Sequence, residues 1–141
     1  MHASTGRWLV VPVDGNRLGG AVTGFDRVNL GDARLAHVQA HGGVGLIGFC
    51  RLADAASLAG ACNFIDLAVL PPGGSIGLHR HSAAQEEFYL VLDGTGTMHR
   101  NGEPFAVRAG DLVRNPPAAE HGLVNSGSTP LRIFVFEVRV P

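Results

Sequence analysis

Short apolar or alternating stretches recur along the chain at the length of β-strands. They lie at residues 7–13, 44–51, 63–70, 75–81, 87–93, 96–100, 104–108, 111–114, 120–124 and 131–139. Sequences rich in Gly, Pro, Asn and Asp, such as 71–74, 93–96 and 101–102, separate the later stretches and are typical of turns. Strands that recur at about ten-residue spacing between such turns predict an all-β sandwich or barrel.

Four segments refine this pattern. Residues 53–61 are short and rich in alanine, and a helix is expected only there. Residues 88–92 and 133–136 are apolar on both faces, which predicts strands covered by a second sheet or by a neighbouring subunit. Residues 1–60 contain no Glu and have weaker strand signals. We expect one domain over 1–141, in which an N-terminal arm (1–60) of extra strands joins a barrel (61–141) or exchanges with a partner subunit.

Composition narrows the possible functions. The chain has 141 residues, a formal net charge of −1 and 16% charged residues, a balance typical of one folded domain. All eleven basic residues are Arg, scattered along the chain, which disfavours nucleic acid and anionic membranes as partners. The absence of Lys excludes Schiff-base chemistry, a lysine-bound pyridoxal cofactor and a phosphate-loop lysine.

Cysteine usage and the N-terminal sequence bear on the compartment. Cys50 and Cys62 do not make a disulfide framework, so a reducing environment is expected. The first residues lack the pattern of a secretory signal, and no apolar run approaches the roughly 18 residues of a membrane span. These features predict a cytoplasmic protein that does not enter membranes.

The segment from Gly43 to Gly48 fits the dinucleotide-binding spacing GxGxxG. That motif binds a pyrophosphate only where its last glycines open a helix. Here the glycines run into the extended-looking residues 49–52, and the chain lacks the strand–helix alternation of a nucleotide-binding sheet. We therefore interpret the match as a chance product of a glycine-rich sequence.

A stronger signal for chemistry lies in the second half of the chain. His79 and His81 are two residues apart in a predicted strand, so both imidazoles point to one face while Arg80 points away. Glu87 begins the next strand, and His121 opens a later one. Three imidazoles and a carboxylate can bind one divalent metal, with zinc, iron, manganese, nickel and cobalt all suited to such ligands. The alternative is that the two neighbouring histidines are polar residues on a solvated strand face.

The spacing of these residues carries a family resemblance. Gly73-x5-His79-x-His81-x5-Glu87-x6-Gly94 resembles the first motif of the cupin family, and Gly110-x5-Pro116-x-Ala118-x2-His121-x3-Asn125 resembles the second. The resemblance implies a single-domain cupin, a small jelly-roll β-barrel, whose metal ligands are His79, His81, Glu87 and His121.

Two positions depart from the family pattern. Glu86 fits the usual spacing from the second histidine, whereas Glu87 fits the spacing to Gly94. Neighbouring side chains on a strand point to opposite faces, so only one of the two can be a ligand. We expect Glu87, because an insertion is more easily absorbed in the preceding loop than within a paired strand. Ala118 stands where the family usually has Gly.

Other side chains are weaker candidates. Tyr89 shares the face of Glu87 and is the expected catalytic residue of the pocket, unless it is an ordinary core aromatic. The apolar residues that could line a cavity are Phe64, Met98, Phe134 and Phe136, although plain core roles are favoured. Packing is likewise favoured for the two cysteines. Surface positions are expected for His2, His37 and His41, whereas the facing of His99 depends on the strand register.

The resemblance implies a metal-dependent enzyme acting on a small organic molecule, as an oxygenase, cyclase or isomerase. Oxalate chemistry is disfavoured because residues 95–97 lack the arginine of that branch, and sugar-phosphate isomerisation because lysine is absent. The alternative is a module that binds or senses a small molecule without catalysis. A storage role is the weakest hypothesis, because storage cupins usually lack the full ligand set. A homodimer is expected from the resemblance and from the doubly apolar strands.

Overall fold

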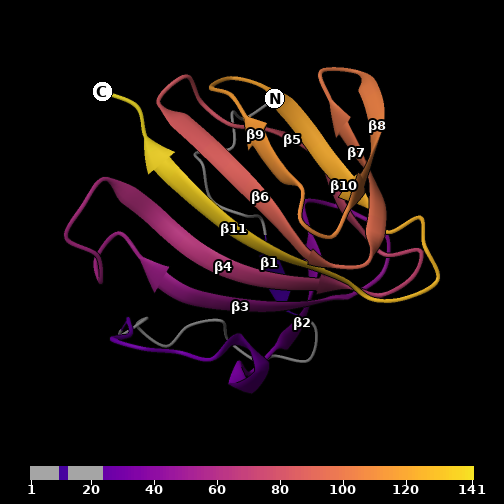
Figure 1. Ribbon diagram of the computed structural model, residues 1–141. Coiled ribbons are helices and arrows are strands. Elements are labelled where there is room, and N and C mark those ends of the chain that lie inside the picture. The colour runs from indigo at the N-terminus through magenta and orange to yellow at the C-terminus, as the bar shows by residue number, and fades with distance from the viewer. Residues whose placement is uncertain (1–9, 13–23) are drawn as a thin grey trace.

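The computed structural model describes residues 10–12 and 24–141, and its strands form one curled sheet (Figure 1). The strands are β1 Val10–Pro12, β2 Ala36–Ala40, β3 Ile47–Asp54, β4 Cys62–Leu70, β5 Ser75–Arg80, β6 Gln85–Asp93, β7 Thr95–Arg100, β8 Glu103–Arg108, β9 Leu112–Asn115, β10 Glu120–Val124 and β11 Leu131–Arg139. Within the described residues the only helix is a three-residue 3₁₀ turn at Leu30–Asp32, and no helix there can span a membrane. The all-β prediction is confirmed.

The sheet has the strand order β8-β7-β10-β5-β2-β3-β4-β11-β6-β9, and β1 pairs with β2. All pairs are antiparallel except β2 with β5. Figure 1 shows that the sheet curls, so that β5, β7 and β10 lie across from β4, β11 and β6. Apolar side chains from both halves form one core, as expected of a barrel whose interior is filled.

The predicted helix at residues 53–61 is wrong. Strand β3 continues to Asp54, and a turn follows in which the Asp54 carboxylate accepts hydrogen bonds from the backbone N–H groups of Ala56 and Ser57. A side chain that satisfies the following backbone in this way stabilises a turn against a helix. The alanine content therefore did not predict the local structure, because the hydrogen bonds of Asp54 stabilise a turn instead of a helix.

The region expected to be an arm contributes strands to the sheet. Strand β3 overlaps the predicted 44–51 but begins and ends three residues later. Strand β2 was not predicted, and only 10–12 of the predicted strand 7–13 lies within the described residues. A side-chain carbon at Gly43 would lie 2.2 Å from the Ser75 backbone oxygen, and one at Gly77 would lie 2.1 Å from the His41 oxygen. These glycines let the β2–β3 turn approach β5. The GxGxxG segment thus leads into a strand, as expected, and has a packing role.

Strand β11 shows how the interior changes along the barrel. Its inward positions run Leu131, Ile133, Val135 and Glu137, all fully buried. The alternate residues Phe134 and Phe136 are half-buried on the opposite face, so they are not part of the apolar core, which was their favoured role, and they do not line the interior. Glu137 lies opposite Glu87 of β6, and Val135 lies opposite Tyr89. One end of the interior is therefore apolar and the other polar.

Candidate metal centre

The four residues with metal-ligand spacing meet at the polar end of the interior. His79 lies on β5 and His81 directly after it, Glu87 lies on β6, and His121 lies on β10. All four are buried, and each offers one donor atom within 4.8 Å of the others. The structure therefore brings the whole predicted set together, from three strands.

Strand geometry explains the convergence. His79 and His81 are buried whereas Leu78 is 60% exposed, which is the alternation expected of a strand. His121 is the direct cross-strand partner of His79, and the two rings lie 4.3 Å apart between centroids. The register shifts between His121 and Leu123, where a bulge re-aims the backbone.

The structure distinguishes the two adjacent glutamates. Glu87 is 1% exposed, and its carboxylate lies 3.0 Å from His121 Nε2 and 3.4 Å from His81 Nε2. Glu86 points the other way, where its carboxylate accepts a hydrogen bond from the exposed Arg114. The group therefore contains Glu87 and excludes Glu86.

Contacts behind the imidazoles fix their orientation. His79 donates from Nδ1 to the Gly77 carbonyl at 2.7 Å, which leaves the Nε2 lone pair directed to the group. His81 Nδ1 lies 2.7 Å from a carboxylate oxygen of Glu137, which is fully buried. Glu137 also accepts a hydrogen bond from the Asn63 side chain at 2.8 Å. A histidine held by a carboxylate behind it is the usual arrangement at metal sites.

Burial sets the charge states of the group. It lowers the pKa values of His79 and His121 to about 3, with help from neighbouring imidazoles, so both rings are neutral. Burial raises the pKa of Glu87 to about 7, against the opposing effect of His81. Burial also lowers the pKa of His81, but the hydrogen bond to Glu137 and the charge of Glu87 reverse the net direction. Neutral imidazoles beside a carboxylate are what a divalent metal requires.

Tyr89 lies beside the group, as its shared face with Glu87 predicted. It is 1% exposed, and its ring meets that of His121 edge-on at 5.5 Å. Burial, followed by the charge of Glu87, raises the pKa of its hydroxyl well above the ordinary value. The phenol therefore keeps its proton and can act as a hydrogen-bond donor within the site.

His41 was expected at the surface, and the structure contradicts this. Its ring stacks on that of His79 with centroids 3.6 Å apart and planes 6° from parallel. Burial and the neighbouring His79 lower its pKa to about 2, so it is neutral. Sequence spacing could not reveal this contact, because it depends on the parallel pairing of β2 with β5.

Two further buried polar residues lie beside the group and are not among the predicted site residues, Glu137 and Asn115. Asn115 ends β9 and is the cross-strand partner of Glu87. A signal was present in both cases. Glu137 continues the inward period of Leu131, Ile133 and Val135, and Asn115 shares the inward parity of Val113.

The remaining candidates lie outside the group. His37 is exposed as expected, His99 is half-buried on β7, and His2 lies outside the described residues. The half-buried thiols of Cys50 and Cys62 are not among the four grouped residues. Met98 belongs to the apolar core, as its favoured role predicted, and Phe64 is buried at the wall of a pocket.

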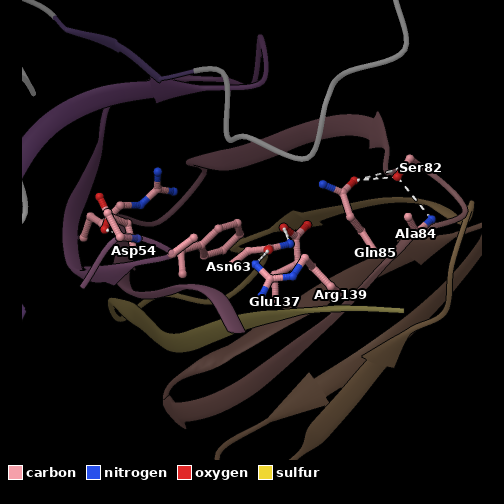
Figure 2. A pocket seen from close by; sticks show the side chains of 11 residues that line it. Asp54, Asn63, Ser82, Ala84, Gln85, Glu137 and Arg139 are labelled. Carbon is pink, nitrogen blue, oxygen red and sulfur yellow. Dashed lines mark hydrogen bonds between the residues drawn. The ribbon is translucent and has the colours of Figure 1, made fainter. Parts of the chain in front are cut away.

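That pocket opens at the polar end and has a volume of about 530 Å³ (Figure 2). None of the four grouped residues lines it, but Glu137, which contacts His81, does. Arg51 of β3 also lines it, paired with the buried Asp66 through two hydrogen bonds of 3.0 and 3.1 Å and placed over the ring of Phe64. The complete lining is Arg51, Asp54, Ala55, Ala56, Asn63, Phe64, Ser82, Ala84, Gln85, Glu137 and Arg139.

The chemistry of the donor set fits a divalent transition metal. The potential ligand atoms His81 Nε2 and Glu87 Oε2 are buried and face each other at 3.4 Å, and neither makes a hydrogen bond among the described residues. Such an arrangement is costly unless a ligand satisfies it. A cation bound by three imidazole nitrogens and a carboxylate oxygen would do so.

Fold and site together define a small β-barrel protein with a buried three-histidine, one-glutamate group. A model of the cupin domain matches residues 66–137, and the chain belongs to the cupin family. The resemblance of the two sequence motifs is thereby confirmed.

Relatives extend this assignment. An oxalate-binding protein of Thermotoga maritima is 32% identical over 93 residues, which cover 66% of this chain and 76% of that protein. An uncharacterised protein of Methanocaldococcus jannaschii is 39% identical over 67 residues, and the match spans about half of it, 53%. The crystal structure of a predicted oxalate decarboxylase from Thermotoga maritima has a TM-score of 0.77 at 26% identity, covering 81% of this chain and 99% of that one.

Proposed function

We propose that this cupin binds one divalent transition metal ion through His79, His81, Glu87 and His121 and acts there on a small organic carboxylate. The observation that carries the proposal is the buried set of four donor atoms within 4.8 Å of one another. When bound, the metal supplies a Lewis acid that polarises an oxygen of the small molecule.

The charge of the centre favours an anionic ligand. A divalent cation with one carboxylate and three neutral imidazoles retains a net positive charge, and a small carboxylate neutralises it. Arg51 adds a cation at the neighbouring pocket, although it is shared with Asp66. The lack of an arginine at residues 95–97 does not exclude a small carboxylate, because Arg51 of β3 supplies an arginine at the pocket. The name of the oxalate-binding relative also supports the carboxylate class.

The residues around the centre have distinct tasks in this proposal. Tyr89 keeps its proton and donates a hydrogen bond to an oxygen that develops negative charge. Glu137 holds the proton at His81 Nδ1 and thereby keeps Nε2 directed inward. The apolar core behind the group excludes water, which strengthens both interactions.

Metal content with a matched pair of variants tests the ligand set. In Glu87→Gln the buried carboxylate is lost, so we expect metal affinity to fall by a hundredfold or more, measured by elemental analysis and titration calorimetry. Glu86→Gln changes the adjacent, outward residue and should bind metal as the wild type does. Retention of metal by Glu87→Gln, or its loss from Glu86→Gln alone, would contradict the proposal.

Oxygenation, cyclisation and isomerisation remain the expected reactions. A non-catalytic binding module is the second candidate, favoured by the name of the oxalate-binding relative. Oxygen uptake and product analysis with the metal-loaded protein and small carboxylates separate the two. Turnover that disappears in Glu87→Gln supports an enzyme, whereas stoichiometric binding without product supports the binding module.

We also propose a homodimer. On the outer face, Phe88 and Phe136 stack with ring centroids 4.8 Å apart, and both are half-buried. Apolar residues on the outside of a barrel are suited to a subunit contact. Light scattering should give twice the chain mass, and a monomeric mass would contradict this proposal.

A further inference from the structure

Asn115 is a buried amide at the wall of the candidate metal centre. It ends β9 with 1% of its surface exposed, and it is the direct cross-strand partner of Glu87. Directly opposite residues on paired strands project to the same face with neighbouring side chains. Asn115 therefore projects to the interior next to the carboxylate of the group.

Neither polar atom of this amide has a hydrogen-bond partner among the described residues. Burying an amide without compensation is unfavourable, because the amide loses its hydrogen bonds to water. Buried amides in folded proteins are therefore hydrogen-bonded in most cases. A buried amide without a partner calls for an explanation, such as a bound ligand.

Asn125 provides an internal comparison, because it is buried to the same 1% exposure. Its Nδ2 donates to the carbonyls of Leu70 and Thr129 at 2.9 and 2.8 Å, and its Oδ1 accepts from the Gly127 N–H at 3.0 Å. This asparagine ties a loop to a strand end. The fold therefore satisfies a buried asparagine where the role is structural.

The surroundings of Asn115 do not demand an amide. Val113, two residues earlier on the same face, is buried and apolar and lies opposite Tyr89. A leucine has nearly the shape of an asparagine and would continue that apolar face. The amide is thus a polar group beside the four potential metal ligands, and a small molecule bound there would supply its missing hydrogen-bond partner.

We propose that Asn115 binds the small-molecule ligand of the centre, donating a hydrogen bond from Nδ2 to a carboxylate oxygen of that molecule. The inference rests on the proposed function, since the ligand shares the metal with Glu87. A neutral amide suits this position. It recognises an oxygen without adding a second negative charge beside Glu87 or a positive charge that would repel the metal.

Asn115→Leu tests this role with three measurements, with oxalate as the probe. Metal content should equal that of the wild type, because Asn115 is not a ligand. Urea denaturation of the metal-free variant should give a midpoint equal to or above that of the wild type, because two unpaired polar atoms are removed. Calorimetry on the metal-loaded variant should show oxalate affinity weakened roughly tenfold or more, the loss expected for one hydrogen bond to a charged group.

Asn125→Leu is the matched control and should unfold at lower urea than the wild type, since it loses three hydrogen bonds. Unchanged oxalate affinity in Asn115→Leu would overturn the proposal, as would a lower midpoint, which indicates a structural role. Loss of metal would make Asn115 part of the donor set instead. A wild type that binds metal but not oxalate would overturn the carboxylate class, whereas a wild type without metal would refute the proposed function itself.

Discussion

The two ends of the barrel interior are built from the same strands, but one end is apolar and the other is polar. On β11 the inward residues are apolar from Leu131 to Val135 and then end in Glu137, and on β10 His121 precedes Leu123. At the apolar end, side chains pack without polar atoms to satisfy. At the polar end, three imidazoles and two carboxylates lie within contact of one another.

The apolar end is therefore expected to stabilise the fold, and the polar end to bind a metal or a ligand. Burial of apolar surface stabilises the fold in proportion to area and needs no partner of defined geometry. Buried ionisable groups stabilise little by themselves and need partners in defined positions. Substitutions at the apolar end should therefore change stability, and substitutions at the polar end should change metal or ligand binding.

The largest effect on stability is expected from Leu131→Ala. Leu131 is fully buried opposite Leu70, so its truncation leaves a cavity and should lower the free energy of unfolding by about 2–5 kcal/mol. Leu112→Ala is the control, because that side chain is 61% exposed and should change little. Urea denaturation measures both. Equal effects of the two variants would contradict the assignment of stability to the apolar end.

Glu137→Gln should weaken metal binding by about 10–100-fold while leaving all four proposed ligands in place. Glutamine has one acceptor oxygen, so it cannot accept from both His81 and Asn63 as the carboxylate does. Titration of metal into the protein measures the change, with the exposed Glu103→Gln as control. Wild-type affinity in Glu137→Gln would show that the orientation of His81 does not depend on this contact.

The metal-free protein should lose stability as the pH falls below 6.5. The folded pKa values of His79 and His121 are about 3 and that of His41 is about 2, so between pH 6.5 and 3 these three imidazoles bind protons only in the unfolded chain. Glu87 and Asp66 act in the opposite sense, because their folded pKa values of about 7 exceed the ordinary 4.5 and 3.8, and their contributions grow as the pH falls between these values.

Glu87→Gln mimics the protonated carboxyl and removes that compensation. Its stability should fall more steeply between pH 7 and 5, by up to about 1.4 kcal/mol per pH unit, the value for one proton. Urea denaturation with a chelator present measures the slopes. Parallel slopes for variant and wild type would argue against a raised pKa at Glu87.

The smallest expected effect is a gain in stability from Ala118→Gly. Ala118 has φ of 62°, in the left-handed region where a side chain costs about 1 kcal/mol. It is also exposed, so no packing is lost. Thermal denaturation should show a higher midpoint. Ala83→Gly, in an exposed loop outside the left-handed region, should not rise, and a rise in both would point to a general effect of glycine.

Strand-length apolar stretches predicted most of the sheet from β3 to β11, because alternation is enforced by burial on one face of each strand. Strand β2 escaped because its five residues, Ala36–Ala40, alternate weakly and contain a histidine and a glutamine. The predicted helix failed because Asp54 caps a turn. The local sequence pattern predicts secondary structure only where no side chain competes for the hydrogen bonds of the backbone.

The four grouped residues could be predicted because each lies on a strand at a fixed spacing within two motifs. Strand parity allowed only one of Glu86 and Glu87 to face the group, and the choice of Glu87 came from placing the extra residue in the preceding loop. In the structure Glu87 is buried and Glu86 is half-buried. Parity indicates that Asn115 faces inward, but neither its place beside the group nor that of His41 could be predicted in the same way. Their positions beside the group depend on which strands are neighbours, β2 with β5 and β9 with β6, and this information is absent from spacing alone.

The parallel contact between β2 and β5 has a consequence for folding. It joins segments far apart in the chain, and His41 reaches His79 only after it has formed. Pairing between segments far apart in the chain slows folding, because the loop between them must be closed first. Of the proposed ligands, only His79 and His81 are near neighbours in the unfolded chain. The proposed metal site is thus complete only when β5, β6 and β10 have come together. If the protein binds metal there, metal content is expected to report how many molecules have formed these strand contacts.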